Sequence, residues 1–303
     1  MHFIQLRVLV VTILFWLYPG IPQLSASQPP LPGGKVQEGE RFPSDLLAKQ
    51  VDFSLYLPPD YEQSSRRYPV VYLLHGFTDD ESAWIQFGEI NRAVDEAIYN
   101  GDVPPMIIVM PDGGFTWYIN DFRSRVPYER MFVEELIPLI DSTYRTRPGR
   151  EFRAVSGLSM GGYGSLMLAM RHPDLFAACA AFSSGLHTDD EIIQMTDERY
   201  DRIFSDLFGH RLRGPERLTE HFKAYNPLDL ARTLPVEQLT KVRWYVDCGD
   251  DDFLFRGNAA LHVLFREREV PHEYRVRDGA HEWVYWRTWV VEGLRFIGES
   301  FHR

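Results

Sequence analysis

Apolar runs alternate with segments of helical periodicity along this chain of 303 residues. Residues 51–57 alternate between apolar and polar side chains, which predicts a half-buried strand. Continuous apolar runs are typical of strands that a parallel sheet buries on both faces. These runs and some shorter stretches place further predicted strands at residues 68–74, 106–110, 152–155, 176–182, 242–247 and 272–276.

Segments rich in helix formers lie between the predicted strands. In residues 128–144, for example, apolar side chains recur three and four positions apart, as on one face of a helix. Repeated alternation of strands and helices predicts an α/β fold with a mainly parallel central sheet and helices on both faces. The predicted helices cover residues 91–99, 128–144, 165–171, 255–268 and 283–301.

Residues 186–235 interrupt this alternation. They are more polar and irregular, with several short helical pieces and no clear strand. We expect a cap-like insertion that covers the strand ends, within one domain that spans residues 36–303. Residues 27–35 are rich in Pro and Gly, which predicts a linker ahead of that domain.

The first 26 residues have the pattern of a secretory signal peptide. Arg7 supplies one positive charge, residues 8–18 are almost wholly apolar, and residues 24–26 offer small side chains for cleavage. The apolar stretch is shorter than the roughly 20 residues that a membrane span requires. We therefore expect a secreted or periplasmic protein; an uncleaved anchor or a buried N-terminal helix is the alternative.

Composition narrows the function classes. The chain is 45% hydrophobic and 14% aromatic, which is typical of a globular protein with a sizeable core. Its formal net charge is −11 and it has no run of Lys or Arg, so nucleic-acid binding is not expected. Cys179 and Cys248 lie in or beside apolar runs and are expected to be buried free thiols. Because no Cys/His cluster has ligand spacing, neither a metal nor another cofactor is expected.

Candidate chemistry centres on the motif Gly157-x-Ser159-x-Gly161, which lies between a predicted strand and a predicted helix. Only glycine at these two positions avoids collision with the neighbouring strand and helix when the chain turns this sharply. Such a turn exposes the Ser159 hydroxyl, and the N-terminal N–H groups of the following helix can bind an oxyanion. Without partners, the motif is equally consistent with a glycine-rich helix start that has no chemistry.

Two later strand ends supply those partners. Chemistry in an open parallel sheet gathers at the carboxyl ends of its strands. The strand at 242–247 is followed by Asp250-Asp251-Asp252, and the strand at 272–276 is followed by His281. The order serine, aspartate, histidine is that of an α/β-hydrolase. His281 would take the serine proton as general base, and the aspartate would fix the imidazole tautomer.

Two assignments stay open at this point: which aspartate is the acid and which histidine is the base. The Gly-x-x-Asp spacing after the strand favours Asp252, with Asp251 next, and the unused aspartates would form a solvated turn or a weak calcium site. His75 follows a predicted central strand and competes with His281, although a His-Gly pair there more often shapes the oxyanion loop. The oxyanion donors are expected to be the backbone N–H groups of Met160 and Phe77.

On these motifs the sequence resembles the family of α/β-hydrolases named Putative esterase. That family includes esterase D-like enzymes (S-formylglutathione hydrolases), feruloyl and acetylxylan esterases, enterochelin esterases and antigen 85 mycolyltransferases. The resemblance implies Ser159 as nucleophile, Asp252 as acid and His281 as base, with Phe77 and Met160 as oxyanion donors. Matching segments occur in family order at residues 56–61, 72–76, 109–113, 134–138, 157–162, 248–252 and 279–283.

We therefore expect a serine esterase that works through an acyl-enzyme. Acetyl or feruloyl esters linked to carbohydrate are the substrate class that we expect. Aromatic side chains that could stack on a sugar or an aromatic acid are expected to line the cleft, with core packing as the alternative; they are Trp84, Trp117, Tyr118 and Trp283. Two other functions use the same fold: an acyltransferase of the antigen 85 type with the same triad, and a non-catalytic binding module. The sequence does not determine the oligomeric state.

Overall fold

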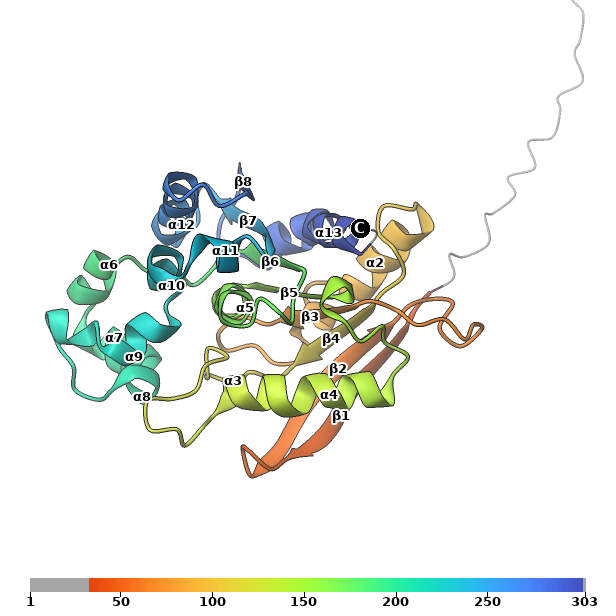
Figure 1. Ribbon diagram of the computed structural model, residues 1–303, viewed down its shortest axis with the longest axis horizontal. Coiled ribbons are helices and arrows are strands. Elements are labelled where there is room, and N and C mark those ends of the chain that lie inside the picture. The colour runs from red at the N-terminus through yellow and green to blue at the C-terminus, as the bar shows by residue number, and fades with distance from the viewer. Residues whose placement is uncertain (1–32, 302–303) are drawn as a thin grey trace, which may run out of the picture. The chain divides into compact units, whose positions relative to one another are not determined.

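The centre of the fold is an eight-stranded sheet, seen in a computed structural model that describes residues 33–301 (Figure 1). The strand order is β1-β2-β4-β3-β5-β6-β7-β8. The strands are β1 (Lys35–Ser44), β2 (Lys49–Leu57), β3 (Val70–Leu74), β4 (Ile107–Pro111), β5 (Arg153–Leu158), β6 (Ala178–Phe182), β7 (Arg243–Gly249) and β8 (His272–Arg277). The described residues belong to a single compact unit.

Most of the sheet is parallel. β3 to β8 all run in the same direction, whereas β2 is antiparallel to both of its neighbours, β1 and β4. Each of the seven predicted strands overlaps one of the observed strands. β1 was not predicted, and its first residue, Lys35, lies in the predicted linker; the rest of that linker up to residue 32, and the predicted signal segment, lie outside the described residues.

Helices cover both faces of the sheet, as the alternating pattern predicted. Side chains that alternate along a strand point to opposite faces, so Val155 packs in the core shared with α5, while its neighbour Ala154 packs in the core shared with α2 and α13. Figure 1 shows α2 and α13 on the side of the sheet away from α5. The helices that pack on these faces include α2 (Ile90–Tyr99), α4 (Ile137–Thr143), α5 (Met160–Arg171), α12 (Phe255–Glu267) and α13 (Trp283–Ser300).

Shorter helices fill the connections. The predicted helix at 128–144 is a continuous run of α3 (Tyr128–Met131), a π-helical turn (Phe132–Leu136) and α4. Two short pieces, α1 (Ala83–Gln86) and α11 (Val236–Leu239), were not predicted. Among residues 33–301, no helix combines the length and the apolar character needed to cross a bilayer. Cys179 and Cys248 are buried and unpaired with each other.

The segment at 186–235 folds into a set of short helices without strands. It packs beside the loop that connects β4 to α3, since the backbone N–H of Phe122 donates to the carbonyl of Leu207 at 2.9 Å. Its helices are α6 (Asp189–Gln194), α7 (Asp197–Ile203), α8 (Ser205–Phe208), a 3-10 turn (Gly214–Arg217), α9 (Glu220–Tyr225) and α10 (Pro227–Thr233).

Candidate active site

Ser159 lies in a sharp turn between β5 and α5. Its backbone has φ +54° and ψ −117°, a conformation that is strained for a residue with a side chain. A Cβ at Gly157 would lie 2.6 Å from the backbone of Gly161, and one at Gly161 would collide with the carbonyl of Leu74. The Ser159 N–H donates to the Phe182 carbonyl at 2.9 Å. Close packing of β5, α5 and the neighbouring strands thus imposes the turn that leaves the hydroxyl accessible.

A chain of hydrogen bonds joins Ser159, His281 and Asp252. His281 Nε2 lies 3.0 Å from Ser159 Oγ, and His281 Nδ1 lies 2.8 Å from Asp252 Oδ2. A carboxylate can only accept, so Nδ1 carries the proton, and Nε2 is left as the acceptor for the serine hydroxyl. The side chain of Asp252 is fully buried, and its other oxygen accepts the Leu254 N–H at 2.8 Å. The acid is therefore fixed in position.

The other two aspartates of this turn face solvent. Asp250 and Asp251 are exposed and gather with Asp278, their carboxylate oxygens all lying within 4.8 Å of one another. One of these carboxylates is partly satisfied, because Asp250 accepts the Gly279 N–H at 3.1 Å. Of the three adjacent aspartates, the structure brings only Asp252 to His281.

Two aromatic rings hold the His281 imidazole. Phe253 lies 4.6 Å from it, centroid to centroid, and Trp286 meets it edge-on at 4.8 Å. Trp286 is buried and its indole N–H donates to Ser183 Oγ at 3.0 Å, whereas Phe253 is 59% exposed. Sequence reasoning missed Phe253, although an apolar residue directly after the acid on a polar turn was a usable signal.

The two predicted oxyanion donors lie close to Ser159. Met160 begins α5, and Phe77 follows β3 in a loop so close that a Cβ on Gly76 would lie 3.7 Å from Ser159 Cβ. Within residues 33–301 neither the Met160 N–H nor the Phe77 N–H donates a hydrogen bond. Free N–H groups beside a nucleophile are what a developing oxyanion requires.

His75 supports this loop. The Gly113 N–H points at His75 Nε2 at 2.8 Å, and because a backbone N–H can only donate, Nε2 must be an acceptor. Nδ1 therefore carries the proton and donates to the Gly76 carbonyl at 2.8 Å. That carbonyl and the Phe77 N–H belong to one planar peptide and point in opposite directions. His75, which is 1% exposed, thus orients a predicted oxyanion donor and is not accessible as a base.

The structure corrects two predicted cleft residues. Trp84 is 1% exposed and its indole N–H donates to the Leu74 carbonyl at 3.0 Å. Tyr118 is fully buried and its hydroxyl donates to the His75 carbonyl at 3.1 Å. Neither side chain has surface to offer a substrate. Both instead hold the backbone at the end of β3, from which the oxyanion loop starts.

Of the other two predicted cleft aromatics, Trp117 is also buried and offers little surface to a substrate, whereas Trp283 is partly exposed. Trp117 is 5% exposed and packs against Phe77 of the oxyanion loop and Phe204 of the insertion, at 6.4 and 5.0 Å between centroids. Trp283 is half-buried and packs 5.7 Å from Phe87, which is 50% exposed. Trp117 therefore joins the oxyanion loop to the insertion, and Trp283 contributes to an aromatic surface at the start of α13.

A cavity adjoins the histidine side of the site. It has a volume of about 370 Å³ and lies between Phe253 and the start of the insertion, where His187, Met195 and Arg199 line it. Burial lowers the pKa of His187, and the charge of Arg199 lowers it further. His187 is therefore a neutral part of the cavity wall near pH 7. The insertion thus forms one side of a space next to the catalytic candidate residues that can hold part of a substrate.

Comparisons with known proteins agree on one family. Residues 44–297 match the sequence profile of the family described as Putative esterase. The solved structure of a ferulic acid esterase superposes with a TM-score of 0.75 at 30% sequence identity, covering 89% of this chain and 99% of that one. These matches confirm the α/β-hydrolase fold predicted from the order of motifs.

Two relatives are larger proteins that match in part. An endo-1,4-beta-xylanase/feruloyl esterase of Xylanibacter ruminicola is 32% identical over 170 residues, which is 52% of this chain and 23% of that protein. An esterase of Mycobacterium tuberculosis is 36% identical over 148 residues, 47% of this chain and 31% of that protein. The matched segment therefore spans less than a third of the length of either relative.

Proposed function

Since the chain belongs to the Putative esterase family, we propose that it is a serine hydrolase that cleaves carboxylic esters through an acyl-enzyme. The observation that carries this proposal is the hydrogen-bond chain from Asp252 through His281 to Ser159, which ends beside two free backbone N–H groups. The nucleophile, the base and the orienting acid are within hydrogen-bonding distance of one another, and two backbone N–H groups near Ser159 are the candidate oxyanion donors.

In the first half-reaction Ser159 Oγ attacks the ester carbonyl carbon while its proton passes to His281 Nε2. The carbonyl oxygen becomes an oxyanion and accepts hydrogen bonds from the N–H groups of Met160 and Phe77. Asp252 stabilises the imidazolium through Nδ1–H. When the tetrahedral intermediate collapses, the bond to the alcohol oxygen breaks, His281 returns the proton to that oxygen, and Ser159 keeps the acyl group.

In the second half-reaction water repeats the attack. His281 removes a proton from the water molecule, whose oxygen adds to the acyl carbon, and the same donors hold the oxyanion. Collapse then breaks the bond to Ser159 Oγ, which regains its proton from His281. The products are the free acid and the original enzyme, so the cycle needs no cofactor.

We further propose acetyl or feruloyl esters linked to carbohydrate as substrates. The names of the relatives support this class, because they include a xylanase/feruloyl esterase and an acetyl esterase of Caldicellulosiruptor saccharolyticus. Exposed aromatic rings at the rim of the site, Phe253 and Phe115, suit stacking on a sugar or on an aromatic acid. Such a substrate also agrees with export, which we propose from the pattern of residues 1–26.

A panel of esters tests the activity. Purified protein should hydrolyse p-nitrophenyl acetate and at least one of acetylated xylan and methyl ferulate, and Ser159→Ala should abolish hydrolysis of each. Hydrolysis by Ser159→Ala at the wild-type rate would refute the proposal. N-terminal sequencing of protein exported from a secreting host tests the location, with a new N-terminus near residue 27 as the expected result.

A further inference from the structure

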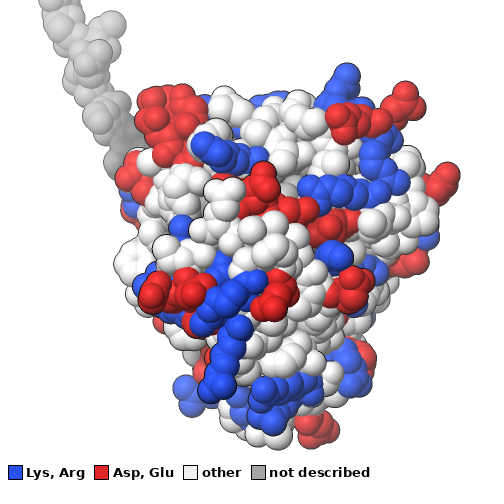
Figure 2. Space-filling model, turned by 90° about the vertical axis from the view of Figure 1, so that its left-hand side faces the viewer, with Lys and Arg blue, Asp and Glu red and all other residues white. Residues whose placement is uncertain are grey.

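A second cavity is lined by Phe115, whose ring packs on Phe77 of the oxyanion loop. It has a volume of about 300 Å³ and is formed by the loop between β4 and α3 and by α8 with the residues after it. An adjoining hollow of about 540 Å³ shares Arg123 and His210 with it and adds Arg211. Figure 2 looks onto the side that carries α7 and α9 and shows Lys and Arg gathered toward its lower end, although the chain is acidic overall.

The arginines of this double cavity have free donors. In the described part of the chain, the guanidinium groups of Arg123, Arg125 and Arg211 form no salt bridge and no hydrogen bond. Most other arginines of residues 33–301 are paired; Arg213, for instance, binds Asp201 at 2.9 Å. Each guanidinium offers five N–H donors in a planar fork that matches a carboxylate.

The carboxylates nearby are largely occupied. Asp121 is buried and accepts the backbone N–H groups of Val126 at 2.6 Å and Arg123 at 3.2 Å, which closes the loop on itself. Asp201 is bound by Arg213, as above. Asp206 is 92% exposed and faces His210 at 3.7 Å. None of these three acids neutralises Arg123 or Arg125.

Phe122 holds two of the basic groups in place. The Arg123 guanidinium lies over its ring at 4.9 Å, and the His210 imidazole meets the same ring edge-on at 5.6 Å. Cation–π contact with a ring face orients a guanidinium while leaving its N–H donors available. The Phe122 backbone is itself tied to α8 through its bond to the Leu207 carbonyl.

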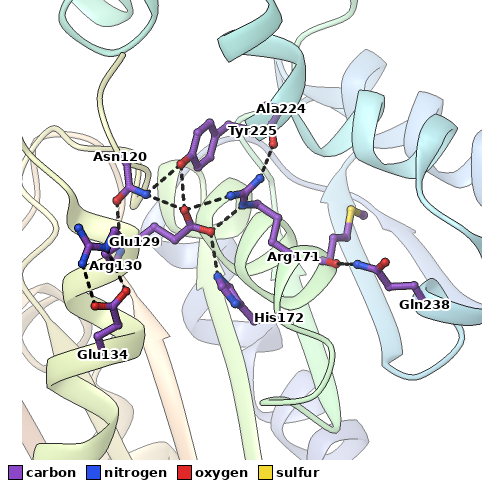
Figure 3. Close-up of polar contacts among 10 residues, drawn as sticks. Asn120, Glu129, Arg130, Glu134, Arg171, His172, Ala224, Tyr225 and Gln238 are labelled. Atoms are coloured by element: carbon purple, nitrogen blue, oxygen red, sulfur yellow. Dashed lines mark hydrogen bonds and ion pairs between the residues drawn. The ribbon is translucent and has the colours of Figure 1, made fainter. Parts of the chain in front are cut away.

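A buried ionic cluster anchors the base of this loop (Figure 3). Asn120 donates to Glu129 at 2.9 Å, and Glu129 also binds Arg171 of α5 at 2.6 Å and the hydroxyl of Tyr225 of α9 at 2.9 Å. The loop that carries Arg123 is thus fixed to the core and to the insertion together. A preorganised loop of this kind loses little conformational freedom when it binds a ligand.

Phe115 connects the wall of the cavity to the oxyanion loop. This side chain lines the cavity, is 62% exposed, and packs 5.0 Å from Phe77, whose N–H is an oxyanion donor. Arg123 and Arg125 line the same cavity as Phe115, so a substrate that reaches over Phe115 would meet them.

We propose that this cavity binds a carboxylate carried by the substrate at a distance from the scissile ester, so that the preferred substrates are esters of saccharides that contain a uronic acid. The inference rests on the proposed function. Arg123 and Arg125 bind the uronate carboxylate through their free N–H groups, and Phe115 packs against the sugar ring between that carboxylate and the ester.

Two matched esters test this inference. One is an acetylated disaccharide of a uronic acid and xylose, and the other is the same compound with its carboxylate reduced to an alcohol. Wild-type protein should have a kcat/KM about tenfold higher for the acidic ester, since charge-assisted hydrogen bonds at an exposed site contribute roughly this much. High salt, about 1 M, should narrow the difference.

Amino-acid substitutions distinguish the binding of a carboxylate in this cavity from the proposed esterase function. In Arg123→Gln/Arg125→Gln the ratio of the two kcat/KM values should fall to about one, while Arg266→Gln, a change of an exposed arginine on α12, should leave it unchanged. Hydrolysis of p-nitrophenyl acetate should be the same in all three proteins. A ratio of one in the wild type, or a preference that survives the double substitution, would overturn the inference. Failure of the wild type to cleave p-nitrophenyl acetate would instead overturn the proposed function on which it rests.

Discussion

The role of each histidine at this site depends on which ring nitrogen carries its proton. His75 is held as the Nδ1–H tautomer by the Gly113 N–H, and it orients the Gly76–Phe77 peptide by donating from Nδ1. The same logic places the proton of His281 on the nitrogen that faces Asp252. Two histidines thus share a tautomer but differ in role, because one is buried beneath the oxyanion loop and the other faces the serine hydroxyl.

A pair of substitutions at His75 tests its supporting role. In His75→Asn the side-chain amide can place an N–H near the position of Nδ1, whereas in His75→Gln the polar atoms reach the position of Nε2. We expect His75→Gln to lower kcat on p-nitrophenyl acetate by roughly 10²-fold, the size typical of a lost oxyanion donor, with little change in KM. His75→Asn should lose clearly less. Equal losses in the two variants would show that the Gly76 contact is not what matters.

Asparagine substitutions distinguish the aspartates of the β7 turn. Asp252→Asn should lower kcat by about 10⁴-fold, as the equivalent change does in serine-protease triads, because the amide no longer fixes the His281 tautomer. Asp251→Asn should keep near-normal activity because Asp251 is exposed and apart from His281. Steady-state kinetics on one ester measure both. Comparable losses would mean that the turn adopts another arrangement in solution.

Sequence reasoning located the residues that sit at strand ends and not the residues that surround them. Ser159, Asp252 and His281 follow from a motif and from the rule that parallel strands gather chemistry at their carboxyl ends. Trp84 and Tyr118 were misplaced because a sequence does not distinguish an aromatic ring that faces a cleft from one that packs beneath it. Arg123 and Phe253 lie on loops, where no periodicity reports which side chains meet.

At the scale of elements, the Glu129 cluster joins α3, α5 and α9. Burial alone would raise the pKa of Glu129, but hydrogen bonds from His172 and Arg171 outweigh it and lower the pKa to about 2. Glu129 is 4% exposed at its side chain, so these contacts are shielded from solvent. The cluster therefore fixes the insertion to the core by an ion pair that depends on the ionised carboxylate.

The pH dependence of unfolding tests this cluster. The folded pKa lies below the ordinary value of 4.5, so the stabilisation is complete above about pH 4.5 and is lost as the pH falls toward 2. In denaturant melts of wild-type protein, the titration of Glu129 should lower the free energy of unfolding by about 3 kcal/mol over that range. The Glu129→Gln variant should not show this pH-dependent decrease. Glu129→Gln should also be less stable at pH 7, because it leaves Arg171 unpaired.

Glu134 provides the control for this measurement. It forms an exposed pair with Arg130 on the same helical run, at 3.0 Å. Solvent screens such pairs, so Glu134→Gln should unfold like the wild type across the pH range. A pH profile of Glu129→Gln that matches the wild type would contradict the role assigned to the cluster.

The elements that sequence patterns predicted are those with a buried face. The central strands β3, β4 and β6 appear as apolar runs, since a parallel sheet covered by helices must bury both faces. β1 was not predicted because it is an edge strand that contains Pro43 and whose residues are mostly charged or polar and partly exposed. The short helices of the insertion have too few residues for periodicity to define their boundaries.

At the scale of the whole molecule, the parallel sheet brings together residues that are far apart in the sequence. Ser159, Asp252 and His281 follow β5, β7 and β8, and the loop after β3 supplies Phe77. The insertion and the loop between β4 and α3 then line two cavities, one beside Phe253 and one beside Phe115. The fold thus fixes the reaction site, and the two loop regions determine which esters reach it.

Labelling of the intact protein tests the central claim most directly. A fluorophosphonate reacts only with a serine that its surroundings activate, so wild-type protein should gain the mass of one label, and peptide mapping should place that label on Ser159. Ser159→Ala should remain unlabelled, and His281→Ala should label far more slowly. The absence of a label on folded wild-type protein, or a label on another serine together with an active Ser159→Ala variant, would contradict this account.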